Sequence, residues 1–129
     1  MMRQIMRQID AGLSQMVERD TMLAAIADSQ PRHLAIWLEN GVVRKLAISD
    51  SGGNGPGAGE TDVWFMGGDV AVVQDVANTY AFDSDRIVLW TDESFEPQTE
   101  MAKEFVMARQ AELLERIRNW AKVFGVELP

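Results

Sequence analysis

Apolar residues recur every three or four positions at both ends of the chain, and every second position between them. In the first segment this spacing predicts an amphipathic helix over about 2–27, with an apolar face of Met2, Ile5, Ile9, Leu13 and Met16. Pro31 closes this helical region. In the last segment, Pro97 suits the first turn of a helix, and Gly125 suits the position just past its end. The pattern therefore predicts a second helix over about 97–124.

The middle segment, about 33–92, predicts three β-hairpins joined by short connections. Their turns are expected at Asn40-Gly41, Gly67-Gly68 and Ser84-Asp85. For the first hairpin we favour a three-residue Glu39–Gly41 loop, because that register aligns Leu34, Ile36 and Leu38 with Val42, Leu46 and Ile48. Consecutive hairpins predict a six-stranded antiparallel meander.

Regular alternation assigns the apolar residues of the hairpins to two faces of this sheet. Besides the first-hairpin residues just given, the face expected to be buried carries Val63, Phe65, Val70, Val72, Tyr80, Phe82, Ile87 and Leu89. The reverse face then carries Ala35, Trp37, Val43, Lys45, Ala47, Trp64, Met66, Ala71, Val73, Ala81, Val88 and Trp90. Such a face is too apolar to be freely solvated. Two explanations stay open: each helix covers one face, or the reverse face binds a partner, a second copy or a ligand.

Together these elements predict a single α+β domain over 1–129: an N-terminal helix, a six-stranded antiparallel β-meander and a long C-terminal helix packed on the sheet. A helix over 97–124 would be about 42 Å long, whereas six strands are about 24–29 Å across. We therefore expect the helix either to overhang the sheet or to pack on something else. The candidate partner-binding residues are Trp37, Trp64, Trp90 and Met66 of the reverse face, or alternatively the overhanging end of the C-terminal helix near Trp120.

The charge is unevenly distributed along the chain. The net charge is −8, and residues 33–96 hold eleven carboxylates against Arg44, Lys45 and Arg86. This region should repel phosphate backbones, so we expect no nucleic-acid partner, and a basic protein would suit it better. The chain has no cysteine and no apolar run long enough to span a bilayer. Its first residues also lack the apolar segment of a secretory signal, so we expect a cytoplasmic protein without membrane association, unless a leader was removed before residue 1.

The glycine-rich segment 50–61 is a candidate phosphate or calcium loop that fails each test. A P-loop needs a lysine, and none occurs between Lys45 and Lys103. A dinucleotide-binding loop must lead into a helix, whereas the residues that follow read as a strand. An EF-hand loop needs glutamate at its last position, where this chain has Thr61. We interpret the segment as a flexible hairpin connection.

Few residues suggest catalysis. His33 is the only histidine, no serine lies in a nucleophile-elbow pattern, and a zinc site would depend on this single imidazole. The acids of the third hairpin, Asp83, Asp85, Asp92 and Glu93, are ordinary turn residues. We therefore predict a protein that is not an enzyme, with no catalytic, metal-binding or cofactor-binding residue and no cofactor.

Three functions remain as hypotheses. The leading one is a small acidic protein-interaction module, an adaptor or chaperone-like protein that self-associates as a homodimer. The predicted architecture resembles, in arrangement alone, small acidic bacterial adaptors such as secretion chaperones, although those interrupt the sheet with a helix. One alternative is a small-molecule pocket between sheet and C-terminal helix that uses Tyr80, Arg44 and Arg109. The other is an acidic inhibitor or immunity protein that contacts its target through the acids of the third hairpin.

Overall fold

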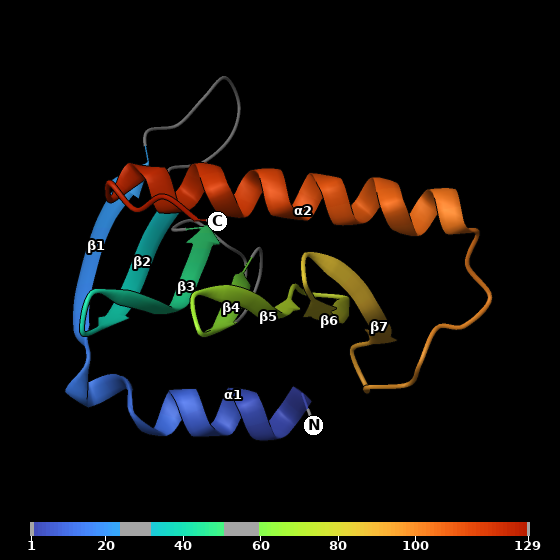
Figure 1. The fold of residues 1–129 in the computed structure, drawn as a ribbon, viewed down its shortest axis with the longest axis horizontal. Coiled ribbons are helices and arrows are strands. Elements are labelled where there is room, and N and C mark those ends of the chain that lie inside the picture. Colours follow the sequence, from blue (N-terminus) through green and yellow to red (C-terminus); the bar gives the residue numbers. More distant parts are fainter. Residues whose placement is uncertain (1, 24–31, 51–59, 129) are drawn as a thin grey trace.

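A computed structural model describes residues 2–23, 32–50 and 60–128. They form one antiparallel sheet with a helix on each side, α1 (Met2–Ala11) and α2 (Lys103–Val123), as Figure 1 shows. The predicted α+β class is therefore confirmed, as is the explanation in which each helix covers one face. Most of the glycine-rich segment predicted at 50–61 lies outside the described residues.

The sheet has seven strands rather than six, in the order β1 to β7 along the chain. The strands are β1 (Val17–Leu23), β2 (Arg32–Glu39), β3 (Val42–Asp50), β4 (Thr61–Met66), β5 (Asp69–Gln74), β6 (Asn78–Asp83) and β7 (Arg86–Asp92). Each strand pairs only with its neighbours in sequence. The meander prediction is thus confirmed, with one strand added at its N-terminal edge.

The added strand, β1, replaces the second half of the predicted N-terminal helix. The helix over 2–27 is wrong because α1 ends at Ala11, and a short 3₁₀ turn, η1 (Leu13–Gln15), leads into the strand. Every residue of β1 pairs with β2, from Arg32 to Leu38. The Arg19 guanidinium also donates a hydrogen bond of 3.1 Å to the carbonyl oxygen of Phe124 at the end of α2. These tertiary contacts hold residues 17–23 as a strand.

The C-terminal helix is shorter than predicted. Pro97 forms a bridge with Thr91, and the Gln98 amide donates to the Trp90 carbonyl at 2.8 Å, so residues 97–98 lie along the outer edge of β7. α2 starts only at Lys103 and has 21 residues, about 32 Å in length. Figure 1 nevertheless shows the first turns of α2 reaching past β7, so the start of the helix extends beyond that edge of the sheet.

Three hairpins, β2–β3, β4–β5 and β6–β7, share one turn geometry. In each, two residues form the turn, and both have positive φ: Asn40 and Gly41, Gly67 and Gly68, Ser84 and Asp85. Such turns match the right-handed twist of the flanking strands. The positions of all three turns are confirmed. The three-residue loop predicted for the first hairpin is wrong, because Glu39 pairs directly with Val42.

The same three hairpins each carry a β-bulge at the same place. The third residue after the turn, which is Arg44, Ala71 or Val88, has no partner in the preceding strand. Each bulge reverses the alternation that a regular strand would have. As a result Val43, Val73 and Trp90 point to the α2 side, whereas Val72 and Leu89 share the α1 side with Trp64 and Ala81. The face assignments predicted for these five residues are wrong for this reason.

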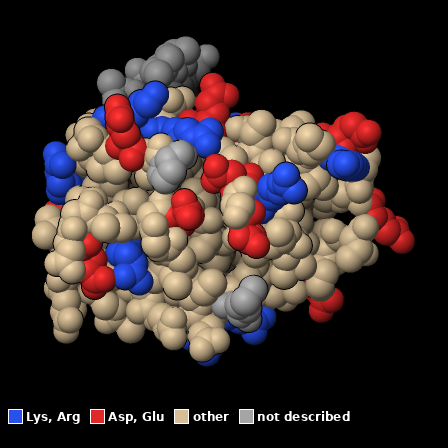
Figure 2. Space-filling view, viewed as in Figure 1, with Lys and Arg blue, Asp and Glu red and all other residues tan. Residues whose placement is uncertain are grey.

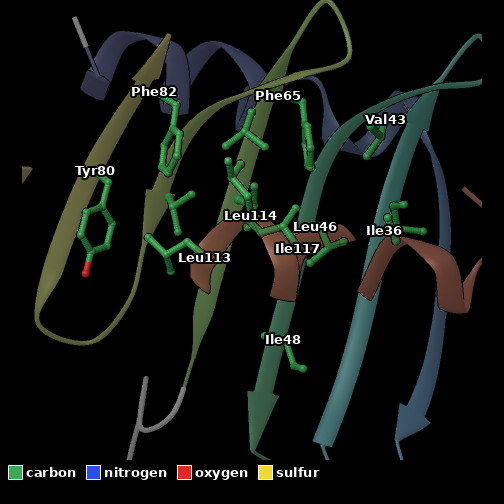
Figure 3. Close-up of a cluster of buried hydrophobic side chains, with 14 of the residues drawn as sticks. Ile36, Val43, Leu46, Ile48, Phe65, Tyr80, Phe82, Leu113, Leu114 and Ile117 are labelled. Atoms are coloured by element: carbon green, nitrogen blue, oxygen red, sulfur yellow. The ribbon is translucent and has the colours of Figure 1, made fainter. Parts of the chain in front are cut away.

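The main core lies between the sheet and α2. Leu113, Leu114, Ile117 and Ala121 of α2 pack against side chains from all strands between β2 and β7, and Figure 3 shows part of this cluster. A smaller cluster on the opposite face joins Met2 and Ile9 of α1 to Trp64, Val72 and Ala81. The sheet is therefore buried on both faces where the helices lie.

Candidate binding site

Trp64, one of the predicted partner-binding residues, is used to hold α1. Its side chain is 2% exposed, and its indole N–H donates to Asp10 Oδ1 at 2.9 Å. The Lys45 ammonium binds the same oxygen at 2.9 Å and lies 4.9 Å from the centre of the Trp64 ring. Trp37 lies on the other side of this lysine, at 5.7 Å, and is half-buried. The cluster fixes the C-terminal end of α1 to the sheet.

Trp90 lies on the opposite face of the sheet, so the prediction that three tryptophans share one surface is wrong. Its indole N–H donates to Asn78 Oδ1 at 3.0 Å, and its ring stacks on Phe105 with 5.6 Å between centroids. Trp120 is half-buried against the α2-side core. Of the five candidates only Met66 is exposed, at 45%.

The proposed pocket residues Tyr80, Arg44 and Arg109 are only partly brought together. Tyr80 is fully buried, and its hydroxyl donates to Asp75 Oδ2 at 3.3 Å. Burial raises the pKa of Tyr80 to about 12, with the Asp75 charge acting in the same direction and Arg109 opposing it. Arg44 instead pairs with Glu39 at 2.7 Å beside the β2–β3 turn. The Tyr80 side chain fills the core.

The acids of the third hairpin have different interaction partners. Asp85 lies 3.5 Å from Arg118 of α2, and Asp92 Oδ1 accepts the backbone N–H groups of Ser94 and Glu96. Asp83 is opposite Arg86 in the register as predicted, but no ion pair joins them in the described part of the chain. His33 lies 3.9 Å from Asp20 across β1 and β2.

Glu93 belongs to a cleft that sequence patterns did not indicate. It has a volume of about 250 Å³ and lies at the edge of the sheet opposite the β4–β5 and β6–β7 turns. We call it the acidic cleft; its lining residues are Glu60, Asp62, Gln74, Asp75, Val76, Thr79 and Glu93. Four of the seven are acidic and none is basic. Figure 2 shows basic and acidic residues intermixed on one face of the molecule. The lining of the cleft, in contrast, has acidic residues and no basic one.

Hydrogen bonds fix the floor of the acidic cleft. Gln74 Nε2 donates to Thr79 Oγ1 at 3.2 Å. Asp75 Oδ1 accepts the backbone N–H groups of Ala77 and Asn78 at 3.0 and 2.8 Å, while its other oxygen accepts from the Tyr80 hydroxyl. Asp75 is therefore held in place, and further acidic residues surround it in the cleft.

Asp62 is the most perturbed acid of the cleft. Burial raises the pKa of Asp62 to about 6; the charges of Glu60 and Asp10 act in the same direction, and Lys45 opposes them. A folded-state pKa above the ordinary value of 3.8 means that the ionised carboxylate destabilises the fold. Stability should therefore rise as the pH falls through about 6 and level off below the ordinary value. A cation in the cleft would relieve the same penalty.

Replacing Asp62 by asparagine tests this assignment. Because the asparagine side chain carries no charge, Asp62→Asn should raise the free energy of unfolding at pH 7.5 by about 1 kcal/mol, a value reduced from the full shift for partial solvent exposure. At about pH 3.5 the gain should vanish, since the wild-type carboxyl is then protonated as well. Urea unfolding at both pH values measures it. Asp69→Asn, at an exposed acid, is the control; an equal gain at both pH values would contradict the prediction.

The cleft could not be predicted from the sequence, because its acids come from separate strand ends. Glu60 precedes β4, Asp62 lies near its start, Asp75 follows β5, and Glu93 follows β7. Only the meander brings these positions to one edge. A weak signal did exist: Asp75 and Asp92 occupy equivalent places in the second and third hairpins, counted from the turn, and each accepts two backbone N–H groups beyond its strand.

Three further observations bear on function. Within 2–23, 32–50 and 60–128, no three His, Asp or Glu side chains are grouped so that they could hold a metal ion. Neither described helix is long and apolar enough to cross a membrane. No protein-family model, curated protein or solved structure matches the chain.

Proposed function

We propose that the chain is a non-enzymatic binding module, adaptor-like in role, that docks a basic protein partner in the acidic cleft. The observation that carries the proposal is the lining of the cleft, in which four of the seven residues are acidic and none is basic. Lysine and arginine side chains of a partner are the natural complement, because they neutralise this charge and donate hydrogen bonds to its oxygens.

A second copy of the chain is the less favoured partner. Two copies, each with a net charge of −8, repel one another. Trp64 and Trp90, the strongest candidates for a homodimer contact, are 2% and 6% exposed and already have partners inside the fold. A small-molecule pocket at Tyr80 is disfavoured for the same reason, since that side chain is fully buried.

The test is binding of a short lysine- and arginine-rich peptide, followed by fluorescence anisotropy of a labelled peptide. We expect binding that weakens at least about tenfold between roughly 50 and 300 mM NaCl, because the contact is between exposed charges. A peptide of the same length rich in glutamate should not bind. Peptide affinity that does not change with salt would contradict the proposal.

A matched pair of double variants separates the cleft from the overall charge. Glu60→Gln with Glu93→Gln removes two cleft carboxylates, whereas Glu100→Gln with Glu104→Gln removes two exposed ones outside the cleft. Both pairs change the net charge equally. The first should weaken peptide binding about tenfold and the second by less than about twofold. Equal losses would show that attraction is general and that the cleft is not the docking site.

A further inference from the structure

A second cavity, of the opposite charge, lies where β7 meets the first turns of α2. It has a volume of about 270 Å³ and is lined by Arg86, Lys103, Met107 and Gln110; we call it the β7–α2 groove. The three α2 residues are spaced four and three apart, which places them on one side of the helix. Figure 1 shows β7 and the start of α2 next to each other. The groove is therefore separate from the acidic cleft, which draws its residues from the opposite edge.

The polar groups of this groove are hydrogen-bond donors. Gln110 Oε1 accepts the backbone N–H of Ile87 at 2.9 Å. The oxygen of the Gln110 side chain is therefore occupied, whereas its NH₂ group remains available as a donor. Arginine and lysine side chains have donors only. The one other lining residue, Met107, contributes an apolar thioether. A ligand that fits must supply acceptors for the donors and an apolar part for Met107.

Both basic residues of the groove are exposed. In the described part of the chain neither Arg86 nor Lys103 makes a hydrogen bond or an ion pair through its side chain, although the protein has more acids than bases. Asp83 is opposite Arg86 in the register, yet it accepts its hydrogen bond from Ser84. Lys103 is also the first residue of α2, where the helix dipole favours an anion.

From this set of donors we propose that the β7–α2 groove binds a small organic oxyanion, a phosphate or carboxylate with an apolar body. The oxyanion lies between the Arg86 guanidinium and the Lys103 ammonium and accepts a hydrogen bond from the Gln110 NH₂ group. Its apolar body packs on Met107. This site is independent of the proposed binding of a basic protein, and each proposal stands if the other fails.

The test is a titration followed by NMR, with phenyl phosphate and benzoate as probes and phenol as the neutral comparison. Binding of either anion should shift the side-chain amide resonance of Gln110 and saturate, and the stronger of the two identifies the preferred oxyanion. Lys103→Gln and Arg86→Gln should each weaken binding about tenfold, since each removes a charged donor. Lys122→Gln removes an exposed lysine from the other end of α2 and should leave the affinity unchanged.

Gln110→Glu provides the sharpest variant. The new carboxylate keeps an oxygen that accepts from Ile87, so the fold is retained, but it replaces the free donor with a negative charge. Binding should then be lost. The proposal is overturned by an unshifted Gln110 amide at about 20 mM of both anions, by phenol binding as tightly, or by Lys122→Gln weakening binding as much as Lys103→Gln.

Discussion

Deleting Ala71 should leave the protein folded, whereas deleting Ala81 should unfold it. Ala71 is the bulge residue of β5 and has no partner in β4. Without it, Val70 still pairs with Phe65 and Val72 with Trp64, so every side chain keeps its face. We expect the deletion to lower the free energy of unfolding by only about 1–2 kcal/mol.

Ala81 lies in β6 between Tyr80 and Phe82, opposite the bulge of β7, but unlike Ala71 it has partners of its own: it pairs with Val72 on one side and Leu89 on the other. Its deletion would turn Phe82 from the α2-side core toward α1. Losing a buried phenylalanine from a core costs about 3–5 kcal/mol, and a small domain has only about 5–15 kcal/mol of stability in total.

Urea unfolding followed by circular dichroism measures both deletions. The comparison is well matched, because each variant loses one alanine from adjacent strands of the same sheet. A deletion of Ala71 that unfolds the protein would show that the bulge itself is required. Similar small losses for the two deletions would show that the register of β6 is not what holds Phe82 in the core.

The second large effect is expected at Trp64. Trp64→Ala should lower the free energy of unfolding by about 3–5 kcal/mol, because a large buried side chain is lost together with its neighbours' contacts. Trp64→Phe keeps much of the packing but removes the indole N–H that Asp10 accepts, a bond to a charged group worth about 1.5–3 kcal/mol. Hydrogen exchange of the α1 amides should increase in both variants.

Trp37→Ala is the control for these variants. Trp37 lies on the same face and near the same lysine, but it is only half-buried and no hydrogen bond to Asp10 involves it. Its loss should cost about 1–2 kcal/mol and leave exchange in α1 nearly unchanged. If the two tryptophans cost the same, or α1 exchanges no faster without Trp64, then the helix is anchored elsewhere.

The turns and the fold class could be predicted from the sequence because their signals are local. Asn40-Gly41 and Gly67-Gly68 tolerate positive φ, and alternation around them identifies strands. The bulges could not be predicted, because Arg44, Ala71 and Val88 have nothing that marks an extra residue. Because regular alternation does not count the bulge residue, it assigns Trp90 to the wrong face.

The missed strand has a different cause. The central charged residues of β1, Glu18, Arg19 and Asp20, follow one another and leave no alternation of apolar and polar positions. At an edge these charges are useful, because they discourage pairing with another chain. Their pattern is nevertheless that of a solvent-exposed helix or loop. The predicted start of α2 is wrong because Pro97, which suits a helix N-terminus, instead forms a bridge with Thr91 of β7.

The repeated bulge has a further consequence for how this architecture changes size. Three hairpins with the same turn and the same extra residue present their apolar side chains to the two faces in the same way, so a whole hairpin is an interchangeable building block. Adding or removing one changes the sheet by two strands, about 10 Å, which corresponds to about six residues of helix. The length of the C-terminal helix should therefore limit the number of hairpins that the sheet can contain.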